Sequence, residues 1–467
     1  MSKTQIYRGT RDHYRAEYFL RKWAQDTIVQ VFELFGFEPL ETPMIEREDT
    51  FTGKYGQEGE TRRFKLSLPY PNEAGLRYDH TVPLARFMAM NWNKVRLPYR
   101  RYVTGPVFRN ETVQAGRLRQ FNQCDFDTVG SSSPIVDAEV VAMNHMVLAK
   151  LGFTRQFKVA VNDRRLLSAL AGELGYNDPS LSIVLFRAWD KLDKVTPGEA
   201  FDYFVEELLR LEDPNNQLEG DDRKRAIKRL RAENQTFPEA TSQLYGLSDR
   251  PSDIALSEVA RLYRSPETRD SVKRMDQLLG LVSSMGVPEG SCQFSPSLAR
   301  GLAYYTGPIF ETVVTEARIG SVTGGGRFDN LIKELGGPNL PASGSSFGLE
   351  RLLDVMEKLE LTPKFPASQT DVYSAMFDPD DTELCAYTFD VVHKLRLTGI
   401  RVEVYTGAVQ RLSKQLEIAN TKDIQLVLII GPDEMQSGSV TYKVLSTGTQ
   451  RSVAKGNIVD ELANLVS

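Results

Sequence analysis

The strand and helix patterns of this chain change about a hundred residues before its end. From there on, short aliphatic runs alternate with amphipathic segments, which is typical of a small βα domain with a largely parallel sheet. The expected strands lie at residues 372–377, 400–405, 424–430 and 440–444, and the expected helices at residues 380–397, 409–420 and 456–465. Because a proline-containing polar linker at residues 361–370 precedes this segment, the sequence predicts a separate domain at residues 371–467.

The preceding 360 residues mix strands and helices without strict alternation, which favours an α+β fold with an antiparallel sheet. Amphipathic helices are expected at residues 14–35, where Gly36 ends the helix, and at residues 135–151. Helical periods dominate the middle of the chain and interrupt the strand-rich segments. The predicted division is therefore a first core part at residues 1–164, a helical insertion at residues 165–285 and a second core part at residues 286–362.

Composition excludes several classes of protein. The 57 basic and 62 acidic residues give a net charge of −5, so any contact with nucleic acid must come from local basic patches. Three cysteines do not make a disulfide framework, which suits a reducing, cytoplasmic compartment. The four histidines lack metal-ligand spacing, and the longest apolar run, residues 426–430, is too short to span a bilayer. We expect a cytoplasmic enzyme with neither a metal site of its own nor membrane contact.

The densest group of residues that could carry chemistry lies around Arg109. A strand ending there, a loop containing Gly116 and a returning strand predict a β-hairpin. Since side chains alternate along a strand, the returning strand presents one face with Phe121, Gln123, Asp125 and Asp127. Arginine suits phosphate because its planar fork donates two charge-assisted hydrogen bonds, and an aromatic ring can stack on a purine. An exposed hairpin with solvated charges explains the composition equally well.

Several other features are individually ambiguous. Residues 298–307 combine glycines with two tyrosines, residues 324–329 begin with three glycines, and residues 344–353 run into a helix whose first turn contains Arg351. Glycines allow close backbone approach, and a helix N-terminus can receive phosphate. A glycine turn is an equally good interpretation of residues 298–307, and an ordinary helix start is the favoured interpretation of residues 344–353 taken alone. Glu311 is either a site-facing carboxylate or a sheet-surface charge. The basic run at residues 223–231 could contact phosphate, but a solvated helix face is the favoured interpretation.

Taken together and in this order, these stretches resemble histidyl-tRNA synthetases, a family of class II aminoacyl-tRNA synthetases. The resemblance covers nearly the whole chain and rests on residues 8–12 and the helix up to Pro43 (motif 1), residues 76–83 (histidine-binding loop), 108–127 (motif 2), 300–307 (histidine-specific peptide) and 348–351 (motif 3). It implies an antiparallel catalytic sheet of six or seven strands, a helical insertion and a C-terminal α/β anticodon-binding domain.

The resemblance also implies the reaction. The expected enzyme is a ligase that attaches L-histidine to its tRNA through a histidyl-adenylate made from ATP, with release of pyrophosphate and AMP. Mg²⁺ is expected to accompany ATP, with ligands that the sequence does not identify. A homodimer is expected, since motif 1 forms the subunit interface in class II enzymes.

Matching residue by residue, the resemblance implies two catalytic residues, Arg109 and Arg300. The implied ATP-binding residues are Arg109, Glu111, Arg117, Phe121 and Arg351. The implied histidine-binding residues are Asp79, His80, Thr81, Arg109, Gln123, Asp127, Arg300, Tyr304 and Tyr305. Two positions depart from the family pattern. Ala303 replaces the usual aspartate, and His80, either a satisfied loop histidine or a gate to the pocket, stands where an apolar or small residue is frequent.

One alternative shares the fold. This is the catalytically silent paralogue that regulates ATP phosphoribosyltransferase in histidine biosynthesis, which generally lacks a full anticodon-binding domain and loses the arginines of motifs 2 and 3. The present chain retains Arg109, Arg300 and Arg351 together with a complete C-terminal βα segment. These features favour the ligase.

Overall fold

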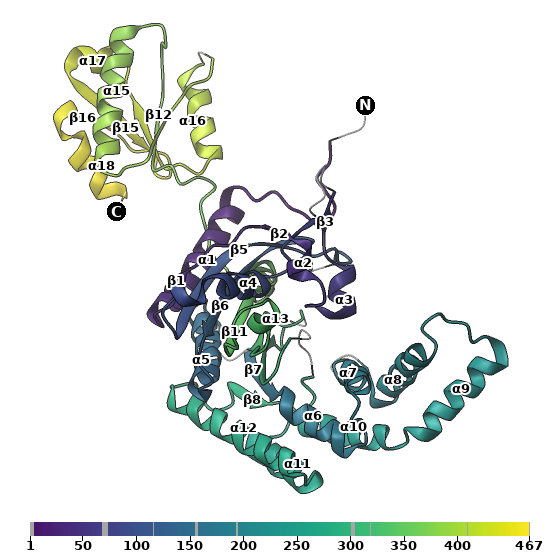
Figure 1. The fold of residues 1–467 in the computed structure, drawn as a ribbon. Helices are drawn as coiled ribbons and strands as arrows, with labels where there is room; N and C mark the ends of the chain where they lie inside the picture. The colour runs from purple at the N-terminus through teal and green to yellow at the C-terminus, as the bar shows by residue number, and fades with distance from the viewer. Residues whose placement is uncertain are drawn as a thin grey trace. The chain divides into compact units, whose positions relative to one another are not determined.

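The structure is a computed structural model that describes residues 4–67, 73–114, 116–154, 157–192, 195–299, 304–317, 319–408 and 410–466. The chain forms two compact units (Figure 1). The first comprises residues 1–11 and 21–362, and the second residues 12–20 and 363–467. Nothing in the described helices is long and apolar enough to cross a membrane.

The first unit is built on a sheet that has eight strands among the described residues. Their order is β1 (Glu38–Pro39), β5 (Tyr99–Phe108), β6 (Gln120–Val129), β11 (Ala342–Gly348), β10 (Thr323–Arg327), β9 (Pro308–Val314), β7 (Phe157–Asp163) and β8 (Cys292–Phe294). The six inner strands are antiparallel, as expected, and the short edge strands β1 and β8 pair in parallel with β5 and β7. The edges raise the total above the six or seven strands that the resemblance implied.

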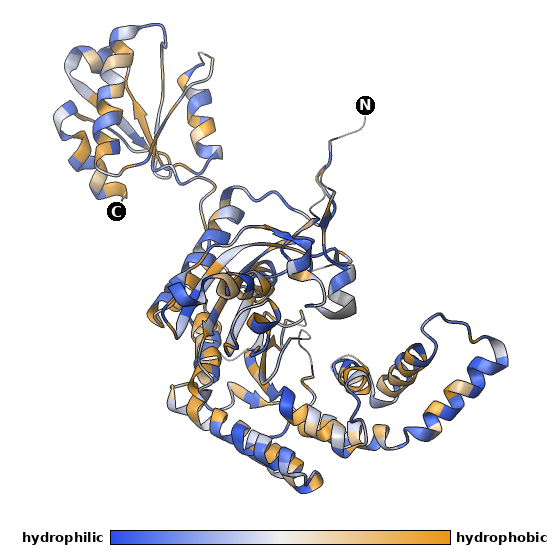
Figure 2. Cartoon of the chain, in the orientation of Figure 1, coloured by the Kyte–Doolittle hydropathy of each residue, from blue (hydrophilic) through white to orange (hydrophobic). Residues whose placement is uncertain are grey.

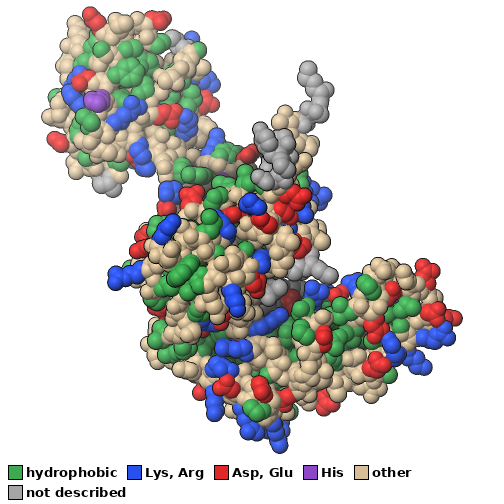
Figure 3. Space-filling model, viewed as in Figure 1, with side chains coloured by type: hydrophobic (Ala, Val, Ile, Leu, Met, Phe, Trp, Pro, Cys, Tyr) green, Lys and Arg blue, Asp and Glu red, His purple; other side chains and the backbone are tan. Residues whose placement is uncertain are grey.

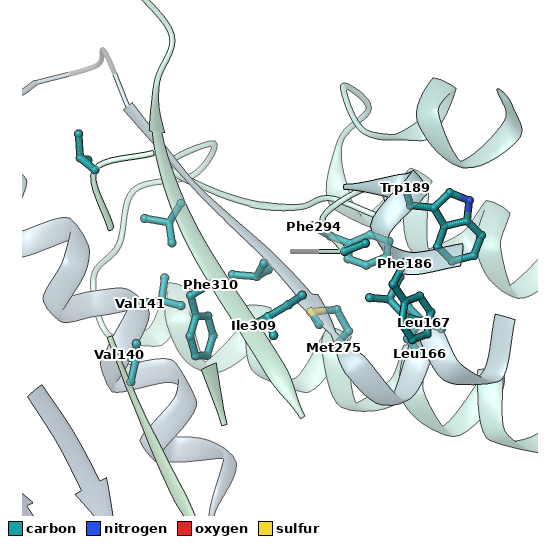
Figure 4. Packing of buried hydrophobic residues seen from close by; sticks show 14 of the residues in the cluster. Val140, Val141, Leu166, Leu167, Phe186, Trp189, Met275, Phe294, Ile309 and Phe310 are labelled. Atoms are coloured by element: carbon teal, nitrogen blue, oxygen red, sulfur yellow. The ribbon is translucent and has the colours of Figure 1, made fainter. Parts of the chain in front are cut away.

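One face of this sheet is covered by apolar helix residues. The predicted helices are confirmed to within one residue at each end: they are α1 (Arg15–Leu34) and α5 (Pro134–Lys150). Gly36 adopts a φ of +75°, which lets the chain turn away from α1. Phe32 of α1 packs against Phe126, with ring centroids 5.0 Å apart. Figure 4 shows Val140 and Val141 of α5 close to Phe310 of β9, in the same buried cluster.

Between β7 and β8 the described chain is helical. The helices are α6 (Arg164–Glu173), α7 (Pro179–Trp189), α8 (Pro197–Glu212), α9 (Gly220–Glu233), α10 (Thr236–Leu247), α11 (Ser252–Leu262) and α12 (Pro266–Ser284). Their local starts are encoded in the sequence; the Thr196 side chain, for example, accepts a hydrogen bond from the backbone N–H of Glu199 in a capping box. Leu166, Trp189 and Met275 belong to the same buried cluster as the sheet, so these helices share its core (Figure 4).

Helix α9 carries the basic run noted in the sequence. Only Leu230 is buried in this helix, which is mostly hydrophilic in Figure 2. Arg223 lies 2.6 Å from a Glu206 oxygen, and Arg231 lies 2.6 Å from an Asp202 oxygen. Figure 3 shows basic and acidic side chains side by side at this end of the helical segment. The pairing favours a solvated, ion-paired helix face, because each pair offsets a charge that phosphate binding would use.

The second unit contains a five-stranded sheet. The order is β13 (Val402–Val404), β12 (Val372–Ser374), β14 (Leu426–Ile429), β15 (Ser439–Val444) and β16 (Gln450–Ala454). Helices α15 (Thr382–Leu397) and α18 (Ile458–Val466) pack through one buried cluster, and α16 (Leu412–Thr421) packs through another. The three helices and the four strands expected from the sequence are present.

The prediction that this second sheet is largely parallel was wrong. Strand β12 pairs in parallel with β13 and β14, but β15 is antiparallel to both β14 and β16. The short helix α17 (Pro432–Ser437) reverses the chain before β15, and β16 then returns in a hairpin. Strand β16 was missed because its residues are mostly exposed and lack an apolar alternation.

Candidate active site

The second face of the large sheet carries charged and small side chains in register. Residues opposite one another in neighbouring strands point to the same face. One row across the sheet consists of Arg101, Asp127, Gly344 and Gly326, and the next of Asp125, Ser346, Gly324 and Glu311. The pairing therefore joins the predicted hairpin to the glycine triplet and to the strand before Arg351.

Two glycines on this face make room for predicted site residues. A Cβ atom on Gly326 would lie 2.8 Å from the Tyr305 ring and 2.8 Å from the Pro308 carbonyl oxygen. A Cβ atom on Gly344 would lie 2.2 Å from a carboxylate oxygen of Asp127. All three distances are below those that real Cβ contacts show, so larger residues would displace Tyr305 and Asp127. The sequence singled out both glycine-containing stretches but not this steric role.

Asp79 lies in the loop between β4 (Ala74–Leu76) and α4 (Thr81–Asn91). Its Oδ1 accepts hydrogen bonds of 3.1 Å each from the backbone N–H groups of Thr81 and Val82 and from the Tyr55 hydroxyl. Its Oδ2 accepts a 3.3 Å bond from the Tyr304 hydroxyl. Burial raises the pKa of this carboxyl. The structure thus joins three predicted residues, Asp79, Thr81 and Tyr304, and adds Tyr55, which the sequence did not reveal.

Asp127 has a buried cationic partner that the sequence did not identify. An Arg101 nitrogen, Nη2, lies 2.7 Å from Asp127 Oδ2 and donates a 3.1 Å hydrogen bond to the His80 carbonyl. Both members of the ion pair are almost completely buried. Burial raises the pKa of Asp127 to about 6, against the opposing attraction of Arg101. Arg101 therefore links Asp127 to the loop that carries Asp79.

His80 is buried beside this pair. Its Nε2 lies 3.2 Å from the Gly105 carbonyl oxygen, and burial, with Arg77 and Arg101 nearby, holds its pKa well below the usual value. The imidazole is therefore neutral and donates from Nε2, which corresponds to a loop histidine satisfied at one nitrogen. Within the described residues, His80 Nδ1 and the Oε1 of Gln123 are buried acceptors without a hydrogen-bond partner. Buried acceptors left unpaired favour a ligand with N–H donors.

Arg109 lies just beyond the end of β5. Its Nε donates a 3.0 Å hydrogen bond to the carbonyl oxygen of Tyr78, the residue before Asp79. Its guanidinium carbon lies 4.4 Å from the Tyr78 ring centroid and 5.2 Å from the Phe121 ring centroid, within cation–π range of both. The rings and the hydrogen bond fix the direction of the cation. Glu111 lies 3.6 Å from Arg62 and 3.7 Å from Arg117.

Arg351 is in the first turn of α14 (Leu349–Lys358), which directly follows β11. Its Nη1 donates a 2.7 Å hydrogen bond to the Ser321 carbonyl, and its Nε a 3.3 Å bond to the Gly116 carbonyl. Gly116 adopts a φ of +68°, and a Cβ there would lie 3.3 Å from Arg351 Cγ. The predicted motif 3 arginine is therefore in contact with the turn of the motif 2 hairpin.

Two residues of the family comparison, Arg300 and Ala303, lie outside the described residues. Among the described residues, no group of three or more His, Cys, Asp or Glu side chains is arranged to hold a metal ion. Glu311 is mostly buried and lies on the charged face of the sheet, in the row of Asp125 and Ser346. This position favours a Glu311 carboxylate that faces the candidate site over a charge on the outer surface of the sheet.

Asp125 yields a prediction about pH. Burial raises its pKa to about 7, whereas an unfolded aspartate has a pKa near 3.9. The stability that its proton contributes is thus present at low pH and lost as pH rises through about 7. We expect the melting temperature of Asp125→Asn, relative to the wild type, to be higher at pH 8 than at pH 5. Asp127 contributes to the raised pKa of Asp125, so Asp127→Asn is measured alongside as a reference. A difference in melting temperature that does not change with pH would contradict the prediction.

An antiparallel sheet whose charged face joins buried carboxylates to the arginines of a hairpin agrees with the class II aminoacyl-tRNA synthetase fold that the sequence resemblance implied. Residues 9–352 match the family model described as histidyl-tRNA synthetase, and residues 371–465 match an anticodon-binding domain. The chain belongs to the histidyl-tRNA synthetase family.

Similar proteins span the full length of the chain. The histidine–tRNA ligase of Cytophaga hutchinsonii is 34% identical over 99% of this chain and 100% of its own, and that of Phocaeicola vulgatus is 34% identical over 98% of each. The histidyl-tRNA synthetase of a Nostoc species is similar in structure, with a TM-score of 0.77, 25% identity and full coverage of both chains.

Proposed function

We propose that this protein attaches L-histidine to its tRNA in two steps, using ATP. The observation that carries the proposal is the bond from Arg109 to the residue preceding Asp79. This hydrogen bond holds the Arg109 guanidinium close to the buried Asp79 carboxylate. An amino-acid substrate needs both charges, because the cation can bind its carboxylate and the anion its ammonium group. The full-length similarity to histidine–tRNA ligases supports the same substrates.

In the first step, a histidine carboxylate oxygen attacks the α-phosphorus of ATP, and the bond to pyrophosphate breaks. In the second, the 3′-terminal ribose hydroxyl of tRNA attacks the carbonyl carbon of the adenylate and AMP leaves. Such transfers need positioning and charge neutralisation more than covalent help from the protein. Arg109 neutralises charge at the α-phosphate, and Arg300 is proposed to act at the join of carboxylate and phosphate. The proposed nucleotide contacts are Glu111, Arg117, Phe121 and Arg351.

The histidine side is proposed to consist of Asp79 and Thr81 near the ammonium group, with Gln123 and His80 beside them. Neutral imidazole has one donor and one acceptor, which a carboxylate and a hydroxyl can satisfy. We assign these roles to Asp127 and Tyr305, with Tyr304 holding Asp79. A site built from buried polar groups rejects apolar analogues strongly, because its own groups would otherwise remain unpaired.

Mg²⁺ is proposed to enter with ATP rather than to occupy a protein cage. Mg²⁺ usually takes one or two carboxylates together with phosphate oxygens, and Glu311 on the charged face offers one such carboxylate. When bound, the ion would neutralise phosphate charge.

Histidine-dependent ATP–pyrophosphate exchange tests the proposed function. Label from pyrophosphate should enter ATP only when histidine is present. A regulatory paralogue would bind histidine without exchange, and that result would overturn the proposal. The intact arginines and the complete anticodon-binding domain support the ligase.

The domain division of the sequence is retained as a proposal: core at residues 1–164 and 286–362, insertion at residues 165–285, and anticodon-binding domain at residues 371–467. The last of these has buried clusters of its own.

Deleting residues 371–467 should reduce tRNA charging by at least about 10²-fold, since the anticodon contacts are lost, but spare most of the pyrophosphate exchange. Equal loss of both activities, in a truncated protein that still melts cooperatively, would contradict this separation.

A cytoplasmic homodimer is also proposed. Large apolar side chains are exposed near the stretch that resembles motif 1, at Met44 and Ile45, and on and after α4, at Met90 and Trp92. An isologous contact between two copies would cover such residues.

Light scattering at micromolar concentration should give twice the 52.6 kDa mass of one chain. Ile45→Glu should shift the mass toward the monomer if β2 (Ile45–Arg47) is in the interface; a monomeric wild type would contradict the proposal.

A further inference from the structure

Arg164, the first residue of α6, contacts the residue before the stretch that resembles the histidine-specific peptide and also the last residue of that stretch. Its backbone N–H donates a 2.8 Å hydrogen bond to the carbonyl oxygen of Gly307. Its side-chain Nη1 donates a 3.3 Å hydrogen bond to the carbonyl oxygen of Ala299. One residue therefore holds the position immediately before Arg300 and the position after Thr306.

The same guanidinium contacts the helical segment. Its central carbon lies 4.2 Å from the ring centroid of Phe186, a buried residue of α7. In the part of the chain that the structure describes, no carboxylate forms an ion pair with Arg164, and burial lowers its pKa to about 10. An aromatic ring and a backbone carbonyl thus hold this cation, and a cation–π contact away from water is worth more than an exposed one.

Other residues also hold the chain at both ends of this stretch. On the Gly307 side, the Thr306 N–H donates a 2.8 Å bond to the Arg327 carbonyl, and the Arg327 side chain pairs with Asp137 at 2.9 Å. On the Ala299 side, Asn162 Nδ2 donates bonds of 2.9 Å to Leu298 and 3.2 Å to Pro296. The Ala299 carbonyl oxygen accepts the 3.3 Å hydrogen bond from Arg164.

We propose that Arg164 is a positioning residue for amino-acid activation, which ties helix α7 of the helical segment to the residue that precedes Arg300. The inference rests on the proposed function. A displacement of about 1 Å in a positioned group can cost up to about 10²-fold in rate. Losing the tie should therefore slow adenylate formation more than it weakens substrate binding, because the Arg164 guanidinium is engaged with the Ala299 carbonyl and the Phe186 ring.

Steady-state pyrophosphate exchange by the full chain, with histidine and ATP varied separately, tests this role. Arg164→Met should lower kcat by about 10-fold while each KM changes by less than about 3-fold. Arg164→Lys keeps a cation over Phe186 and should recover most of the rate. Phe186→Leu removes the ring but not the hydrogen bonds, and should lower kcat about 3-fold. Arg187→Met is the matched control, since Arg187 neighbours Phe186 but pairs with Glu207; it should leave kcat unchanged.

A wild-type kcat in Arg164→Met would overturn the inference, even if the melting temperature fell, because Arg164 would then be only structural. Failure of lysine to recover any rate in a folded protein would also overturn it. Should Arg164→Met fail to fold, Phe186→Leu decides: a reduced kcat supports the tie and an unchanged kcat overturns it. No exchange by the wild type would refute the proposed function itself, which distinguishes the two failures.

Discussion

Replacing Arg109 by methionine is expected to reduce histidine-dependent pyrophosphate exchange by about 10²- to 10³-fold, the loss typical of one preorganised charge donor. The guanidinium is already fixed by Tyr78 and Phe121, so it needs no reorientation as charge develops at the α-phosphate. The affinity for ATP should fall less than the rate, because the interaction strengthens in the transition state. Exchange kinetics at varied ATP measure both effects.

Two comparisons sharpen this prediction. Arg109→Lys keeps the charge but loses the planar fork, and should fall between the wild type and Arg109→Met. Arg100→Met removes an arginine from the same segment that lies on the opposite face of β5 and pairs with Glu139, and it should retain the exchange rate. If Arg109→Met exchanged at more than a tenth of the wild-type rate, Arg109 would not be the catalytic cation.

Replacing Arg101 by methionine should destabilise the protein by about 3–5 kcal/mol, which is the usual cost of leaving a buried charge without its partner. Asp127 would lose the cation 2.7 Å away, and the His80 carbonyl would lose a donor. Histidine activation should be lost as well, since Asp127 and the Asp79 loop would no longer be held together. Urea denaturation measures the free energy of unfolding.

A second substitution separates the two effects. In Arg101→Met with Asp127→Asn, the orphaned charge is gone, so part of the lost stability should return while activity does not. The single Asp127→Asn variant provides the reference for additivity. An Arg101→Met protein as stable as the wild type would show that Asp127 is already protonated in the folded state at neutral pH.

Local features of the fold were predictable because their causes lie within a few residues. The helix that ends at Leu34 follows from apolar spacing and Gly36. The antiparallel pairing of β5 and β6 followed from two strand patterns around one glycine-containing loop. The C-terminal sheet was predicted less well, because strand direction depends on how a connection reverses the chain, and α17 left no clear pattern.

Some residues of the candidate site could likewise be predicted from the sequence, and others could not. Arg109, Gln123 and Asp127 stood out because they share a hairpin with the spacing of a strand face. Tyr55 and Arg101 did not, because nothing near them in the sequence indicates that they contact Asp79 and Asp127. Their selection required a loop and a strand register that bring distant segments together.

By itself, the sequence determined helices, the hairpin with its charged face and, through ordered motifs, the family. The tertiary structure decided which strands are neighbours, that Arg101 is the partner of Asp127, and that Gly326 and Gly344 leave room for Tyr305 and Asp127. The physical reason is the separation along the chain over which each interaction acts. Capping, turns and side-chain alternation act over a few residues, whereas desolvation, ion pairing and steric exclusion act between atoms that only the folded chain brings into contact.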